Sequence, residues 1–182
     1  MVATGTPAPR PWIRLWARCV DYLLWGVIIY FPLVMAHRSG AISSPEYKLI
    51  ATFPMLIVST WALIEPIVLA VFGTTVGKAL LSIRLAHPPS EGLSMADLGP
   101  LFKRSFSVCL KGVGIGYLVA TLITGLFSYG NLKSQGETSW DRNGGFVVTH
   151  GKVGYLGGGA VAIICLVGMC YVLIWVFLQI QH

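Results

Sequence analysis

Charge is scarce in this sequence. Only 11% of its 182 residues are charged and 55% are apolar, whereas roughly a quarter of the residues in an average soluble domain are charged. The mean hydropathy is +0.73, so there is too little charge to cover the surface of a soluble fold of this size. These values exclude an ordinary cytosolic enzyme, and they exclude a disordered chain. The composition therefore predicts an integral membrane protein of the all-α class, in contact with the lipid bilayer.

The sequence also lacks the patterns that hold metals and cofactors. Its four cysteines lie in or beside apolar stretches without Cys-x-x-Cys spacing, which is typical of small buried residues. Its four histidines are scattered, with no Asp or Glu at ligand or triad spacing. The Lys and Arg residues flank apolar runs and do not cover a folded face. We therefore expect no enzyme activity, no metal, no cofactor and no nucleic-acid partner.

Long apolar runs are what the sequence does contain. A membrane-spanning helix needs about 20 mostly apolar residues, and residues 15–36, 49–72 and 153–180 satisfy this. Residues 112–132 are just long enough, and they either cross or re-enter on the same side. Residues 96–111 carry four charges and predict an amphipathic helix at the interface. We expect a polytopic protein with four hydrophobic helical segments and one amphipathic helix.

The distribution of Lys and Arg predicts the orientation. Cytoplasmic loops are rich in these residues, and the loop at 37–48 has only Arg38 and Lys48. We therefore expect a cytoplasmic N-terminus in the cell inner membrane, with basic residues near anionic headgroups. The eight Lys and Arg residues assigned to the inside are Arg10, Arg14, Arg18, Lys78, Arg84, Lys103, Arg104 and Lys111.

Small residues recur at every fourth position in two of these segments. Such spacing lets another helix approach closely, although glycine is also simply common in membrane helices. We interpret the repeats as packing faces. Their main members are Gly112, Gly116 and Ala120 in one segment and Gly154 and Gly158 in the other.

Three charges fall inside apolar segments: Arg18, Asp21 and Glu65. Each costs several kcal/mol there unless it is paired or hydrated. Arg14 and Arg18 share a helical face with Asp21, which predicts either an ion pair that orients the helix or a role in moving ions or substrate. Glu65 precedes a proline that frees a backbone carbonyl. It can bind a cation, carry a proton, or pair with Arg14 or Arg18.

Three segments resemble the RDD family of membrane proteins. Arg14-Leu-Trp-Ala-Arg-Cys-Val-Asp21 resembles the start of that family. Gly73-Thr-Thr75-Val-Gly77-Lys78, followed by Leu81-Ser-Ile-Arg84, is similar to its Gly-x-Thr-Pro-Gly-Lys loop. Residues 140–148 resemble its closing element, which begins at an aspartate, here Asp141. The chain departs from the family pattern in two places, with Val76 at the usual proline and Phe146 at the usual threonine.

The resemblance covers about residues 10–150 and implies one arginine and two aspartates as the family's named positions, here Arg14, Asp21 and Asp141. It implies transport, with cation/proton exchange in some members, and it places the loop of Asp141 beside the Arg14 end of the first helix. For Lys78 we expect a turn in which the ammonium group meets lipid phosphate.

We therefore divide the chain into a tail (1–9), an RDD-like membrane domain (10–150) and a further transmembrane helix (151–182). The central hypothesis is one polar cluster of Arg14, Arg18, Asp21, Glu65 and Asp141, with Lys78 at its rim and Arg14 as the partner of Asp21. The functional alternatives are an ion-coupled transporter working as a homo-oligomer and a non-catalytic subunit of a larger membrane complex.

Overall fold

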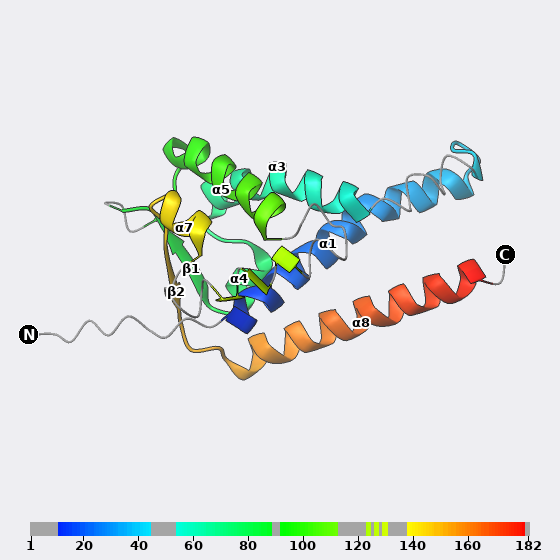
Figure 1. Cartoon of the computed structure of the whole chain (residues 1–182). Coiled ribbons are helices and arrows are strands. Elements are labelled where there is room, and N and C mark those ends of the chain that lie inside the picture. The colour runs from blue at the N-terminus through cyan, green and yellow to red at the C-terminus, as the bar shows by residue number, and fades with distance from the viewer. Residues whose placement is uncertain are drawn as a thin grey trace, which may run out of the picture.

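Three long helices run from a shared polar end of the protein (Figure 1). They are α1 (Pro11–Arg38), α3 (Pro54–Phe72) and α8 (Tyr155–Ile180). This computed structural model describes residues 11–44, 54–88, 92–112, 123–124, 126–127, 129–130 and 138–180. Residues 12–38 and 55–72 are long and apolar enough to cross a membrane by length and composition, and a shorter apolar stretch covers 155–168.

The polar end is built from short elements that connect the long helices. They are α4 (Val76–Leu80), β1 (Ile83–Ala86), the 3-10 turn η1 (Met95–Asp97), α5 (Leu98–Lys111), α7 (Ser139–Asn143) and β2 (Val147–His150). The end of α3 and the starts of α1 and α8 all lie here (Figure 1). Because of this arrangement, residues far apart in the sequence meet in one small region.

The fold is mostly helical, as predicted, but it also contains a small sheet that we did not expect. Strands β1 and β2 pair antiparallel, with Ile83 opposite His150 and Arg84 opposite Thr149. Ile83 and Leu85 are buried and Arg84 is exposed, which is the alternation of a half-buried strand. Each strand has only four residues, so a search for long apolar runs passes over both.

Two clusters of buried side chains hold the polar end to the long helices. The first joins α1, α4, β1 and α8 through Ala17, Val20, Leu81, Ile83 and Val161. The second joins α3, β1 and α5 to the residue before β2 through Leu69, Ala70, Leu85, Leu101 and Phe146. Phe146, which replaces the family's usual threonine, is therefore a core residue of this chain.

The structure also shows why Val76 can replace the proline that is usual in the family. Val76 is the first residue of α4 and Thr75 is its N-cap. Proline is favoured at the first helical position because the amide there needs no intrahelical partner. Valine can occupy the same position, so the helical turn that the family's proline would begin is present.

The predicted packing face of the last helix is wrong by part of a turn. A Cβ atom at Gly154 would meet nothing within 4 Å, and one at Gly158 would make only an ordinary contact with Val153. The close approaches are instead at Gly157, which faces the carbonyl of Leu80, and at Gly168, which faces Leu23. Gly154 is the residue before α8, where its carbonyl accepts a hydrogen bond from the Gly158 amide.

The other predicted packing face is described only at its first member. A Cβ atom at Gly112 would lie 3.3 Å from the Trp140 ring of α7, so this glycine ends α5 against a short helix. Gly116 and Ala120 lie outside the described residues.

The helices that flank the segment 112–132 lie at the same end of the protein. Helix α5 precedes the segment and α7 follows it, and the two helices are in contact. A single straight crossing would separate them by the length of a membrane-spanning helix. This is the arrangement that the re-entrant alternative requires, although most of the segment itself lies outside the described residues.

Candidate functional site

Glu65 is the centre of the first group of buried charges. It lies midway along α3 and is 1% exposed. Lys78 Nζ donates to its Oε1 at 2.6 Å and Arg18 Nη2 donates to the same oxygen at 3.2 Å. Ser105 Oγ donates to Oε2 at 3.0 Å. Of the partners we considered for Glu65, the structure shows Arg18 and adds Lys78.

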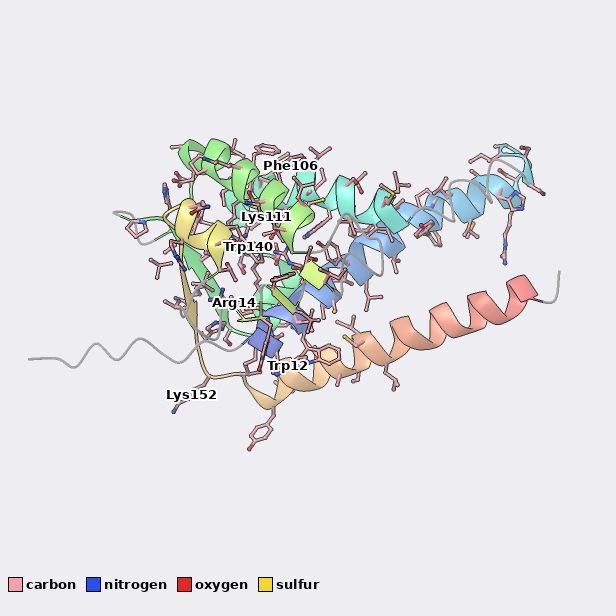
Figure 2. All side chains as sticks on the ribbon, in the orientation of Figure 1. Trp12, Arg14, Phe106, Lys111, Trp140 and Lys152 are labelled. Atoms are coloured by element: carbon pink, nitrogen blue, oxygen red, sulfur yellow. The ribbon has the colours of Figure 1, made fainter. Side chains whose placement is uncertain are left out.

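Asp141 is the centre of the second group. It is buried in α7 and receives Arg14 Nη1 at 3.0 Å and Arg104 Nε at 2.8 Å. Thr138 Oγ1 donates to it at 2.6 Å. The first turn of α1 and the short helix α7 are therefore joined by an ion pair, as the resemblance implied. Figure 2 shows Arg14 at the beginning of α1, below Trp140 of α7.

Arg104 connects the two groups. While its Nε binds Asp141, its Nη1 lies 3.8 Å from Glu65 Oε1. The side chain is 5% exposed, and the guanidinium carbon lies 5.9 Å from the centre of the Phe146 ring. We predicted an interfacial role for the helix of Arg104 and assigned this residue no site. The available signal was its spacing from Leu101 and Val108, because residues three or four apart share a helical face.

The predicted pairing of Arg14 with Asp21 is wrong. Asp21 accepts a hydrogen bond from Thr75 Oγ1 at 2.6 Å and one from the Gly77 amide at 2.8 Å. Arg14 is turned toward α7 and β2, where its Nε also donates to His150 Nε2 at 3.2 Å. The turn between α3 and α4 supplies the donors that Asp21 needs. In the described part of the chain no Lys or Arg forms an ion pair with Asp21.

Residues 73–75 form the turn between α3 and α4, and Lys78 lies in α4 with its ammonium group on Glu65, not directed outward as expected for a contact with lipid phosphate. Gly73 ends α3 with a φ of +70°, a conformation that favours glycine. Lys78 is 8% exposed and points to Glu65. Burial lowers the pKa of Lys78, and Glu65 opposes that shift. A buried lysine keeps its charge through such a partner, which accounts for its inward direction.

The buried charges nearly balance. Four cations, Arg14, Arg18, Lys78 and Arg104, face three carboxylates. Burial raises the pKa of Asp141, but Arg104, Thr138 and Arg14 outweigh that effect and hold it below its usual value. Asp141 therefore stays ionised at neutral pH and preserves its pairing with both arginines.

The structure brings Arg14, Arg18, Glu65 and Asp141 into one network through Arg104, and it places Asp21 beside them at the turn of Thr75 and Gly77. Sequence reasoning missed Arg104, Ser105, Thr138 and His150. Arg84 does not join the network and lies exposed on the sheet. Among the described residues, no group of three or more His, Cys, Asp or Glu side chains is placed to hold a metal ion.

Comparison with known proteins agrees with this geometry. The RDD family model matches residues 8–174, a range that includes every charged residue of the network and extends into α8. No curated protein and no solved structure matches the chain. The apolar helices indicate a membrane protein. Because the match covers most of the sequence and the family's arginine and two aspartates lie at the polar end, the chain belongs to the RDD family of membrane proteins.

Proposed function

We propose that this protein is an ion-coupled membrane transporter that exchanges protons for cations as an oligomer, with Asp21 as the exchanging carboxylate. The supporting observation is the difference between Asp21 and the other two buried carboxylates. Glu65 and Asp141 are each held by two cations within 3.2 Å. Asp21 is 4% exposed, and it accepts hydrogen bonds from a hydroxyl and an amide.

This difference matters because a carboxylate in a low-dielectric site needs a compensating positive charge. Fixed ammonium and guanidinium groups supply it to Glu65 and Asp141. Lys78 is bound to Glu65, so only its field acts on Asp21. We assign the remaining compensation at Asp21 to a mobile proton or cation, which can bind and leave without breaking an ion pair. Oligomerisation is part of the proposal because the few long helices of one chain cannot enclose a path for ions. The exposed apolar side chains of α1, α3 and α8, including Ile28, Leu63 and Ile163, are compatible with contact either with lipid or with a second copy.

The transport proposal is tested by Asp21→Asn in proteoliposomes that hold a pH-sensitive dye. Asparagine conserves the volume and can accept from Gly77 while donating to the Thr75 hydroxyl. We expect normal assembly and loss of cation-dependent proton movement. The matched control is Asp97→Asn, which changes an aspartate outside the network and should leave exchange intact.

Two results would contradict this proposal. Wild-type protein that moves no protons under any cation gradient would end the transporter interpretation. Full exchange by Asp21→Asn would remove Asp21 from the mechanism while leaving transport possible. Glu65→Gln is a poor substitute for this test, because it leaves Arg18 and Lys78 buried without their carboxylate.

We propose that the protein lies in the cell inner membrane with its polar end facing the cytoplasm. We also propose that the segment 112–132 enters the membrane and returns on the same side. Three helices then cross, with residues 37–48 outside. The support is the scarcity of Lys and Arg in that loop, together with the meeting of Arg14, Arg104 and Asp141 at one end.

Impermeant thiol labelling of intact cells tests this orientation in a background from which the four native cysteines have been removed. A cysteine at Ser43 should react from outside, whereas one at Asn143 in α7 should be protected until the cells are opened. Both positions are exposed. Labelling at Asn143 with protection at Ser43 would show the opposite orientation. Labelling at both positions would contradict the placement of α7 on the same side of the membrane as the N-terminus.

The second candidate function is a non-catalytic subunit of a larger membrane complex. The observation that favours it is the double pairing of Glu65 and Asp141, which suits a rigid joint between helices better than a moving part. Size after mild detergent extraction distinguishes the two. A homo-oligomer supports transport, and stable co-purification with unrelated chains supports the subunit role.

A further inference from the structure

A polar cavity of about 410 Å³ lies at the sheet, outside the buried network. Strands β1 and β2, the turn between α4 and β1, and the segment that leads from β2 to α8 supply its wall. Its lining residues are Ser82, Arg84, Thr149, His150, Gly151 and Lys152. Its polar side-chain groups include the Arg84 guanidinium, the Lys152 ammonium and the hydroxyls of Ser82 and Thr149, and none of the lining residues is acidic or aliphatic.

The register of the sheet places the donors together. Arg84 lies directly opposite Thr149, and residues opposite each other in an antiparallel pair project on the same face. The Gly151 amide donates to the Ser82 carbonyl at 2.8 Å, which brings Lys152 next to this pair. Figure 2 shows Lys152 extending from the segment between β2 and α8. A second cavity also has Ser82 and Arg84 in its wall.

The charges of Arg84 and Lys152 take no part in the ion pairs of the described residues, and both residues are exposed. An arginine fork and a nearby lysine recognise phosphate groups through charge-assisted hydrogen bonds. The cavity is larger than one phosphate, so it has room for a phosphate with a small polar substituent.

Ser82 adds an independent observation. It is the one described residue other than glycine with a positive φ, 53°, and it follows α4 at a position where glycine is favoured. A serine there costs free energy that glycine would not, and such strain gathers at functional sites. The benefit of serine at this position is a hydroxyl on the wall of the cavity.

We infer that this cavity is a binding site for a phosphate-bearing anion, with Arg84 and Lys152 as its charged contacts and Ser82 and Thr149 as hydroxyl donors. The site adjoins the buried network through the backbone of β2, because Thr149 lies on the cavity side and the next residue, His150, projects on the opposite face, where it accepts a hydrogen bond from Arg14. A ligand held here stabilises the junction of β2 with α1. The phosphate belongs either to a lipid headgroup or to a free anion.

The test uses the full-length protein in nanodiscs, with thermal stability and calorimetric titration as readouts. Inorganic phosphate is titrated into protein in phosphatidylcholine discs, and in parallel the melting temperature is compared between those discs and discs that contain phosphatidic acid. Arg84→Gln and Lys152→Gln are compared with Lys103→Gln, which removes an exposed positive charge from α5, outside the cavity. Each cavity variant should weaken binding by about tenfold, the usual effect of losing one charge-assisted hydrogen bond.

The outcomes distinguish a free anion, a lipid headgroup and diffuse charge attraction. Saturable phosphate binding that both cavity variants weaken and Lys103→Gln retains supports a free anion. Stabilisation only by phosphatidic acid, with the same pattern among the variants, supports a lipid headgroup. An equal response of all three variants would show diffuse charge attraction and overturn the inference, and so would the absence of any response in the wild-type protein. Unchanged melting of the variants without ligand verifies that they fold.

Discussion

Replacing Arg104 with alanine should leave little folded protein. Arg104 is the only described residue that approaches both Glu65 and Asp141, and its removal takes a charge-assisted hydrogen bond from Asp141. Breaking a buried ion pair by removing one partner typically costs about 3–5 kcal/mol. We expect a large fall in the melting temperature and in the yield of monodisperse protein after detergent extraction, both measured by fluorescence-detected chromatography with heating.

Three further variants test whether the loss of stability comes from the bridging position of Arg104. Lys103→Ala removes the neighbouring cation, which is exposed, and should melt like the wild-type protein. Arg104→Lys should have an intermediate melting temperature, because one ammonium group cannot contact two carboxylates from both sides as a guanidinium does. Adding Asp141→Asn to Arg104→Ala should cost less than the sum of the two single changes. Wild-type melting of Arg104→Ala would contradict its bridging role.

Replacing Gly77 with alanine should separate α4 from α1. A Cβ atom at Gly77 would collide with the carbonyl oxygen of Ala17 and would lie 3.0 Å from Asp21 Oδ1. The backbone of α1 cannot move aside as a flexible side chain can. Overpacking of this kind costs about 1–3 kcal/mol, and displacement of the Gly77 amide also weakens its hydrogen bond to Asp21. We expect a lower melting temperature together with weaker cation-dependent proton movement.

The control for this substitution is Gly159→Ala in α8. A Cβ atom there would meet nothing within 4 Å, so the change should leave stability equal or slightly higher, since alanine favours a helix over glycine. If Gly77→Ala melted like Gly159→Ala, the close approach of α4 to α1 would be wrong.

Composition and apolar run length were sufficient to predict the helical class and the positions of the long helices. They could not predict the sheet, because strands of four residues carry too little periodicity and their pairing depends on contacts between residues 83–86 and 147–150. The packing face of α8 was misplaced because a repeat of glycines does not fix where a helix begins.

Arg18, Asp21 and Glu65 were predictable because each is costly in an apolar segment without a partner. Arg14 was predicted from the helical face that it shares with Asp21, and Asp141 from the resemblance to the RDD family. Their partners were not. Helical spacing placed Arg14 and Asp21 on one face, but two residues seven apart on a helix lie two turns apart, and a partner from another element can be nearer. Arg104 was missed because its own helix carries other charges, and the one signal that distinguishes it from the exposed Lys103, its spacing from the apolar Leu101 and Val108, does not name a partner.

The order in which the chain is synthesised gives the Arg14–Asp141 ion pair a consequence for biogenesis. The two residues are 127 positions apart, and ribosomes add about 5–20 residues per second, so Arg14 waits roughly 6 to 25 s for its partner. During that interval α1 must be accommodated with Arg14 directed to the headgroup region, as long basic side chains allow. Closure of the polar end is therefore a late, post-insertion step, and a chain truncated before α7 would lack the contact that locks its first helix.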